Sequence, residues 1–295
     1  MLYTIGEILL DIIFRDGQPV AARPGGAMLN TAVSLGRCGH KVALISELGS
    51  DTPGTIILNF LESNHVDVSY IRRHETGKTG IALAFLDEKG DASYTFYKDY
   101  PEERLNQPKP HFSSDDILLF GSFYSLIPEV RKPVMEIVGK AREAGATIIY
   151  DPNIRSPHKH EMGEKRPSIL ENISYARIVR ASDEDFKTAF DVTNSVDAWE
   201  ICRSQGCPML MYTMNAGGVR VFTEASEDFY PVAKIKPLST IGAGDNFNAG
   251  VMHAMARGNA LQETAILAEN GIAFATDVCL SYDNYVSWEF AKERG

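Results

Sequence analysis

The chain has 295 residues, of which 44% are hydrophobic and 23% charged, and its formal net charge is −10. This is a globular composition, and an acidic chain without a long basic run argues against a nucleic-acid or anionic-membrane partner. The four cysteines form no C-x-x-C pair and no run of ~18 uncharged apolar residues occurs, so we expect reduced thiols, no membrane span and a cytoplasmic protein.

Apolar runs typical of strands alternate with helix-like stretches over most of the chain. The opening stretch, residues 1–14, carries Glu7 and Asp11 among its apolar residues, which is typical of a strand rather than a signal peptide. Near-continuous apolar strands separated by helices predict a parallel sheet covered on both faces. The expected fold class is therefore α/β, a three-layer α/β/α sandwich. Five further stretches have the strand pattern: 41–46, 116–122, 146–153, 176–182 and 208–213.

Residues 79–98 interrupt this alternation of strands and helices. Apolar residues alternate at Ile81 and Leu83 and again at Tyr94 and Phe96, on either side of the turn-forming sequence DEKGD. This pattern predicts an antiparallel hairpin. The hairpin is either an edge of the main sheet or a small sheet that projects as a lid over a site at the strand ends.

The stretch "STIGAGDNFNAG", residues 239–250, joins a turn of small residues to a helical pattern. Phe247, Val251 and Ala254 fall on one helix face, and Gly258 marks the end of the pattern. The first backbone N–H groups of such a helix have no intrahelical partners, and small residues let a ligand approach them. The helix dipole adds about half a positive charge there. The segment therefore predicts an anion hole made from main chain.

Asp245, directly behind this turn, has two possible roles. It can cap the first helical turn. It can also act as a general base beside the anion hole, where an attacking hydroxyl must lose its proton to reach phosphorus. A Walker-type Gly-Lys-Ser/Thr and a G-x-G-x-x-G after the first strand are both missing from the sequence. These local features leave both roles open.

Two separated segments carry a family resemblance. "GGAMLNTAVSLGRCG" (25–39) and "STIGAGDNFNAG" together resemble the two signatures of the ribokinase (PfkB) family of sugar kinases. Within that family, "GEILLDIIF" and "DPNIR" look most like the bacterial fructokinase branch, which shades into 2-keto-3-deoxygluconate kinases. Further stretches resemble family landmarks in the right order: 6–11, 47–54, 151–155, 182–185 and 211–221.

The resemblance implies a ribokinase-like sandwich over residues 1–295 with a small β-sheet lid formed by about 12–24 and 76–100. It implies ATP-dependent phosphorylation of a sugar hydroxyl, first of all that of fructose, with ATP and Mg²⁺ as cofactors. Asp245 would be the general base. The residues that would hold the transferring phosphate are Gly242, Ala243 and Gly244.

The same resemblance puts the sugar under the lid, at the carboxyl ends of the strands, where open α/β sheets bind ligands. Asp11 can accept two hydroxyls, and Asn30 can donate and accept at once. Arg155 could reach a hydroxyl or a sugar carboxylate. Lys98 is either a sugar contact or a solvated lysine at a strand end. The glycines expected to let the backbone approach the sugar ring are Gly25 and Gly26.

The nucleotide side matches the family less closely. Thr213 and Gly218 match a Thr-x-Gly-x-x-Gly turn, and Asn215 stands where a Gly is usual, although Asn also tolerates left-handed backbone. Asn270 falls where the last helices of the family border the adenine. These residues are the expected nucleotide contacts.

Three further positions depart from the family pattern. Ser182 and Asp185 replace the Asn and Glu of an Asn-x-x-Glu motif that organises phosphates and Mg²⁺, so Asp185 would reach Mg²⁺ through a water. Ser239 stands where the family usually has an Asp that helps to hold a monovalent cation. We therefore expect little or no activation by potassium.

Two alternatives and the oligomeric state stay open. The departures at Ser182, Asn215 and Ser239 would suit a sugar- or nucleotide-binding regulator without turnover. The alternative substrates within the family are 2-keto-3-deoxygluconate, another hexose or a nucleoside. Arg155 could bind the carboxylate of a sugar acid, whereas Asp11 favours a neutral polyol. A homodimer through the lid and a monomer are both compatible with the sequence.

Overall fold

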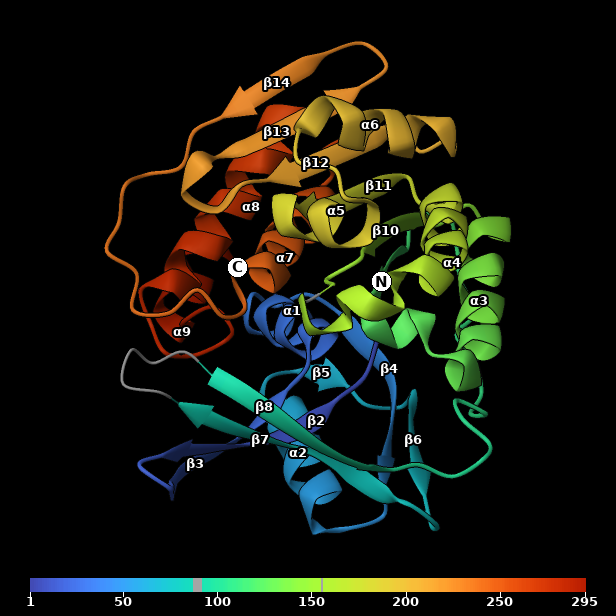
Figure 1. Ribbon diagram of the computed structural model, residues 1–295, viewed down its shortest axis with the longest axis vertical. Coiled ribbons are helices and arrows are strands. Elements are labelled where there is room, and N and C mark those ends of the chain that lie inside the picture. Colours follow the sequence, from blue (N-terminus) through green and yellow to red (C-terminus); the bar gives the residue numbers. More distant parts are fainter. Residues whose placement is uncertain (87–91, 155) are drawn as a thin grey trace.

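The computed structural model describes residues 1–86, 92–154 and 156–295. Two sheets and two layers of helices make up this part of the chain (Figure 1). The main-sheet strands are β1 (Leu2–Ile5), β4 (Val42–Gly49), β5 (Val66–Asp67), β6 (Ile71–His74), β9 (Ile117–Gly121), β10 (Thr147–Asp151), β11 (Ile178–Ser182), β12 (Met209–Thr213), β13 (Val219–Thr223) and β14 (Glu227–Tyr230). The helices are α1 (Ala27–Arg37), α2 (Thr52–Ser63), α3 (Pro128–Glu143), α4 (Met162–Tyr175), α5 (Asp183–Phe190), α6 (Ser195–Ser204), α7 (Ala243–Ala256), α8 (Thr264–Cys279) and α9 (Trp288–Arg294).

The main sheet has the order β14-β13-β12-β11-β10-β9-β1-β4-β5, with β6 also paired to β4. Its strands pair in parallel from β12 to β5, whereas β13 and β14 add in antiparallel fashion at one edge. Every residue of β4 is buried, as expected for a strand with helices on both faces. The predicted parallel sheet is confirmed, and the carboxyl ends of its parallel strands lie along one edge.

A separate hydrophobic core lies on each face of the main sheet. One core joins α1, α2, α7, α8 and α9 to the sheet, and the other joins α3, α4, α5 and α6 to its opposite face. The two cores share the strands, whose side chains alternate between them: Ile178 belongs to the first core and Val179 to the second. The three-layer sandwich is therefore confirmed.

The second sheet has the order β3-β2-β7-β8, with β2 (Leu9–Arg15), β3 (Gln18–Gly25), β7 (Lys78–Leu86) and β8 (Ala92–Asp99). It lies below the main sheet in Figure 1. Strands β7 and β8 pair in antiparallel fashion, which confirms the predicted hairpin. The hairpin is part of this separate sheet rather than an edge of the main one.

The opening stretch does not form the single strand that the sequence predicted. Strand β1 ends at Ile5 in the main sheet, and β2 begins at Leu9 in the second sheet. Between them, Gly6 has no room for a side chain, because a methyl group there would come within 2.5 Å of Met28 Cγ. Asp11 therefore lies inside a strand of the second sheet, not just past the end of β1.

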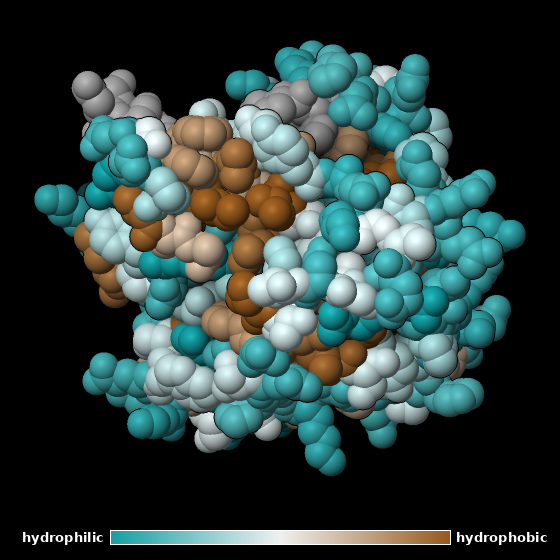
Figure 2. Space-filling view, turned by 90° about the horizontal axis from the view of Figure 1, so that it is seen from below, coloured by the Kyte–Doolittle hydropathy of each residue, from teal (hydrophilic) through white to brown (hydrophobic). Residues whose placement is uncertain are grey.

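The second sheet exposes apolar side chains on both of its faces. Val20, Phe85, Tyr94, Phe96 and Tyr97 are all more than a third exposed. Figure 2, seen from this end of the molecule, shows hydrophobic side chains gathered on part of the face. A homodimer through this sheet stays a prediction. Among the helices of the described residues, none is both long enough and apolar enough to cross a membrane.

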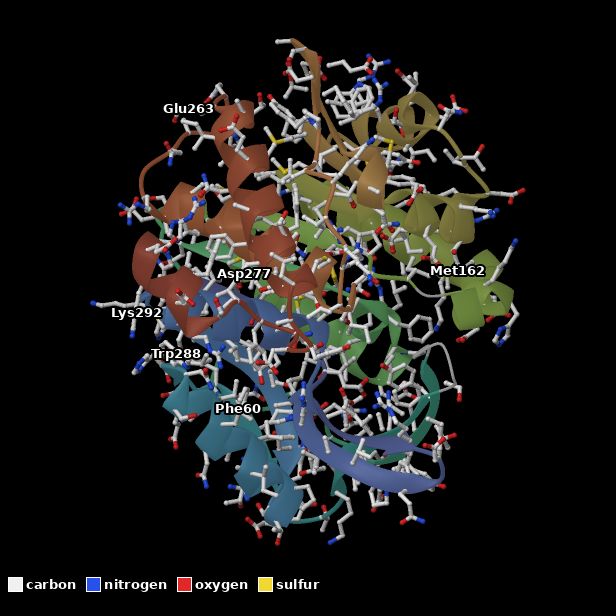
Figure 3. The ribbon with its side chains drawn as sticks, turned by 90° about the vertical axis from the view of Figure 1, so that its left-hand side faces the viewer. Phe60, Met162, Glu263, Asp277, Trp288 and Lys292 are labelled. Atoms are coloured by element: carbon white, nitrogen blue, oxygen red, sulfur yellow. The ribbon has the colours of Figure 1, made fainter. Side chains whose placement is uncertain are left out.

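The segment between α8 and α9 packs against the start of α7. Asp277 of α8 accepts hydrogen bonds from the Ser287 N–H (2.8 Å) and hydroxyl (3.2 Å), and Ser287 caps α9. Figure 3 shows Asp277 close to Trp288, the first residue of α9. Within this segment the Asn284 carbonyl accepts a hydrogen bond from Asn246 Nδ2 (2.8 Å). The C-terminal segment thus supports the beginning of α7.

Candidate active site

Helix α7 begins as the sequence predicted. Its N-cap is Gly242, with φ 81°, and it ends at Ala256, with Gly258 at φ 94° just beyond. No side chain of the described residues caps its N-terminus. The Ala243 N–H donates to the Thr240 carbonyl (3.3 Å), whereas the N–H groups of Gly244 and Asp245 have no partner among the described residues. These two amides are free to face an anion, and the dipole of the helix adds to their positive potential.

The two glycines of this turn face protein. A methyl group on Gly242 would come within 2.8 Å of the Asn284 carbonyl oxygen. One on Gly244 would come within 2.5 Å of Arg180 Nη1. We expected small residues here so that a ligand could approach. The structure gives a second reason, because the C-terminal segment and Arg180 fill the space where side chains would go.

The Asp245 carboxylate is held by two amide groups. It is 5% exposed; its Oδ2 accepts from Asn30 Nδ2 (2.8 Å) and its Oδ1 accepts from Asn153 Nδ2 (3.1 Å). It does not cap α7, so the alternative structural role proposed for it is wrong. Among the described residues no cation pairs with it. The carboxylate is therefore fixed in orientation while it keeps lone pairs for a proton.

Asp151, at the end of β10, lies behind this carboxylate. It is fully buried; its Oδ1 accepts from the Asn153 backbone N–H (3.0 Å), and its Oδ2 accepts from Asn248 Nδ2 (2.6 Å) and Arg180 Nη1 (3.1 Å). Burial raises the pKa of the Asp151 carboxyl; Arg180 opposes this shift and the nearby charge of Asp245 adds to it. Asp151 thus anchors both Asn153 and Arg180.

Sequence reasoning missed these supporting residues. Asn153 has φ 42°, a left-handed conformation that Asn tolerates, and this turn aims its amide at Asp245. Only the motif "DPN" after a buried strand hinted at it. Arg180 and Asn248 gave no signal, because an arginine in an apolar strand and an asparagine in a helix become informative only when their partners are known.

The predicted sugar residues fall into three groups. Asn30 contacts Asp245, as described above. Gly25 lies against Asp11, since a side chain at Gly25 would collide with that carboxylate, and Gly26, with φ 132°, lies against the Glu7 carbonyl. Lys98 Nζ instead pairs with Glu7 Oε2 (2.7 Å), and Arg155 lies outside the described residues.

The predicted nucleotide turn lies at the end of β12. Thr213 Oγ1 accepts from Arg180 Nη2 (2.9 Å), which ties this strand end to the start of α7. Asn215, at φ 48°, and Gly218, at φ 94°, shape the turn between β12 and β13. Asn270 lies elsewhere: its Nδ2 donates to the Ile266 carbonyl (2.8 Å) within α8. Whether these residues bind nucleotide stays a prediction.

Ser182 and Asp185 form a capping box at the start of α5. The Asp185 N–H donates to Ser182 Oγ (3.1 Å), and Asp185 Oδ2 accepts from the Ser182 N–H (2.7 Å). Asp185 Oδ1 accepts from the Ile154 N–H (2.6 Å). Burial, and then the charge of Asp151, raise the pKa of the Asp185 carboxyl. Both residues therefore stabilise the fold here, whatever else they bind.

A hollow of about 590 Å³ lies beside α5 and the β12–β13 turn. Its lining includes Asn215 together with Lys187, Lys159 and Thr188. Asp245 does not line it. The hollow is on the side of the predicted nucleotide residues, whereas Asp245 lies at the N-terminal end of α7.

The comparisons with known proteins agree with this arrangement. A parallel-rich α/β sandwich with a second small sheet defines a ribokinase-like kinase fold. Residues 2–276 match the model of the pfkB family of carbohydrate kinases. The chain belongs to this family.

Among sequence relatives, a fructokinase of Rhizobium leguminosarum bv. trifolii is 29% identical over 291 residues, covering 94% of this chain and 87% of the relative. An aminoimidazole riboside kinase of Salmonella typhimurium is 25% identical over 270 residues, covering 91% and 84%. Among solved structures, a fructokinase of Vibrio cholerae O395 with fructose, ADP and calcium ion has a TM-score of 0.85 at 20% identity, covering 97% of this chain and 95% of that one. The last likeness shows the fold alone.

Proposed function

We propose that this protein transfers the γ-phosphoryl group of ATP to a hydroxyl of a neutral sugar, first of all fructose, with Asp245 as general base. The observation that carries the proposal is the Asp245 carboxylate, which is buried, held by two amides and placed at an uncapped helix mouth. A base in this position can accept the hydroxyl proton while the amides of α7 stabilise the transferring phosphate.

The nucleotide and metal would meet this site from the side of β11 and β12. The uncapped amides of α7 fit a phosphate, and relatives of this fold have been solved with ATP or an ATP analogue. Asp185 would reach Mg²⁺ through a water, because its side chain is shorter than the Glu usual in the family and is held by the N–H groups of Ile154 and Ser182. Mg²⁺ bound in this way would neutralise phosphate charge and keep several waters.

The charges around the second sheet favour a neutral substrate. Lys98 is paired with Glu7, and Tyr100 also donates to Glu7 Oε1 (2.8 Å), so this lysine is already neutralised. Asp11 adds a further carboxylate beside Gly25. Lys98 is therefore not available to bind the carboxylate of a sugar acid, which favours fructose or a riboside over 2-keto-3-deoxygluconate. Relatives named fructokinase and aminoimidazole riboside kinase support the same two candidates.

The test is a phosphorylation screen with ATP and Mg²⁺ over fructose, ribose, aminoimidazole riboside, 2-keto-3-deoxygluconate and nucleosides. Asp245→Asn should lower kcat by about 10²- to 10⁴-fold on the accepted sugar. Asp191→Asn is the matched control; Asp191 is exposed, and its φ of 62° suits Asn, so activity should not change.

The same screen also tests the alternative function, a sugar-binding protein without turnover. A binding protein without turnover would bind a sugar equally well as wild type and as Asp245→Asn, and neither would consume ATP. That result would replace the kinase proposal. Turnover of 2-keto-3-deoxygluconate in preference to every neutral sugar would keep the kinase but overturn the substrate assignment.

A further inference from the structure

Arg180 is a buried cation next to the N-terminal end of α7. Its side chain comes from β11 and is 8% exposed, and its guanidinium packs against Gly244 in the first turn of α7. Nη1 donates to Asp151 Oδ2 (3.1 Å) and Nη2 donates to Thr213 Oγ1 (2.9 Å). One side chain thus joins the helix mouth, the predicted nucleotide turn and the carboxylate network.

The placement of this charge is unfavourable unless an anion binds. The N-terminus of a helix is the positive end of its dipole, so a guanidinium beside it is repelled. Asp151 pairs with Nη1 of Arg180 (3.1 Å), and Nε of Arg180 has no partner among the described residues. A buried donor without a partner is rare in folded proteins and calls for an explanation.

We propose that Arg180 is a positioning residue for the terminal phosphate. It adds a fixed positive charge behind the amides of Gly244 and Asp245, so that the helix mouth binds a nucleotide triphosphate in preference to a diphosphate. Gly244 is glycine because this guanidinium occupies the space of a side chain. The inference rests on the proposed function, since it assumes that the helix mouth receives the γ-phosphate.

Calorimetry would measure the affinities for a non-hydrolysable ATP analogue and for ADP, and the ratio of the first to the second is the quantity compared between variants. The affinity for inorganic tripolyphosphate would be measured as well. Arg180→Gln should lower the ratio, and the affinity for tripolyphosphate, by about tenfold to a hundredfold. Arg180→Lys keeps the charge and should restore most of the ratio. Arg131→Gln is the control: Arg131 bonds Ser125 and Asn172 on the far face of the sheet, and the ratio should not change.

A double variant separates this role from a merely structural one. If Arg180 only neutralised Asp151, then Asp151→Asn with Arg180→Gln would regain the wild-type ratio, and that result would overturn the proposal. Our proposal requires the affinity ratio to stay low in the double variant. The double variant and Arg180→Lys also carry the test if Arg180→Gln alone fails to fold.

The outcomes for the two proposals are distinguishable. A wild-type ratio in Arg180→Gln, or a wild-type protein without any preference for the triphosphate, overturns the role of Arg180. Failure to phosphorylate any sugar overturns the proposed function alone, because the binding ratios need no turnover.

Discussion

Two buried carboxylates lie at the carboxyl ends of main-sheet strands or beside them, and they differ in their partners. Glu47, near the end of β4, is 3% exposed and receives hydrogen bonds from Arg104 Nε (2.5 Å), Tyr124 OH (2.9 Å), His74 Nε2 (2.9 Å) and the Leu105 N–H (3.2 Å). Asp245 receives two amide bonds and no cation among the described residues.

The difference supports the proposal that Asp245, and not Glu47, is the reactive carboxylate. Four converging donors, one of them an arginine, occupy both oxygens of Glu47 and hold the carboxylate in an ion pair. Two neutral amides orient Asp245 without neutralising it, at a helix mouth without a cap. Burial alone therefore does not identify a reactive acid; the number and charge of its partners do.

The largest effect on stability should come from Glu47→Gln. This change leaves Arg104 buried without its anion, which typically costs about 3–5 kcal/mol of unfolding free energy. Denaturant unfolding should show this loss, whereas Asp245→Asn should change stability far less. Glu171→Gln, an exposed partner of Arg131, is the control, with an expected cost below about 1 kcal/mol. An equal loss in Asp245→Asn would remove the distinction between the two carboxylates.

Removal of one of the two side-chain amides that hold Asp245 should lower kcat more than it lowers the stability of the fold. Asn153→Gly keeps the left-handed backbone but removes the Nδ2 donor, so kcat on the accepted sugar should fall by about tenfold. Steady-state kinetics and thermal unfolding on the same sample compare the two effects. Asp191→Gly, at an exposed left-handed position, controls for added flexibility. Unchanged kcat in Asn153→Gly would show that this amide does not orient the base.

The carboxylate network should also leave a signature in the pH dependence of stability. The folded-state pKa of Asp151 is raised above its ordinary value of 3.8, so the native state binds its proton more tightly than the unfolded chain. The contribution of Asp151 therefore makes stability fall as pH rises from 3.8 through the folded pKa. Unfolding free energies measured at several pH values should therefore give, above pH 3.8, a more positive slope against pH for Asp151→Asn than for wild type, because the negative contribution of Asp151 is removed. A slope identical to wild type would contradict the direction of this shift.

The smallest expected effect is that of potassium. Ser239 offers one neutral oxygen, and its Oγ already accepts from the Ile241 N–H (3.2 Å). Turnover should be nearly the same in potassium and in a large organic cation. A strong potassium dependence would mean that the mouth of α7 relies on a bound cation as well as on its own amides.

Much of the fold was predictable because its signals are local. Runs such as 208–213 are apolar throughout, and the spacing of Phe247, Val251 and Ala254 places them on one face of α7. The break between β1 and β2 was not predictable, since both halves have the same strand composition and only the contact of Gly6 with Met28 separates them.

The site was predictable where a motif is continuous in sequence. Asp245 and its turn lie in one such segment. Asp151 and Asn153 lie at the end of β10 and Arg180 lies in β11, and each acquires its role from partners as far as 97 positions away, as in the bond from Asn248 to Asp151. Such contacts depend on the register of neighbouring strands, which composition and periodicity do not specify.

The second sheet is joined through the chain to the helix that holds Asp245. Strand β3 ends at Gly25 and helix α1 starts at Ala27, so Gly26 is the single residue between the second sheet and the helix whose Asn30 holds Asp245. A rotation of that sheet around Gly26 would pull directly on the helix that orients the carboxylate. In the proposed kinase, a closing movement of the second sheet over a sugar would therefore also move the helix whose Asn30 orients Asp245.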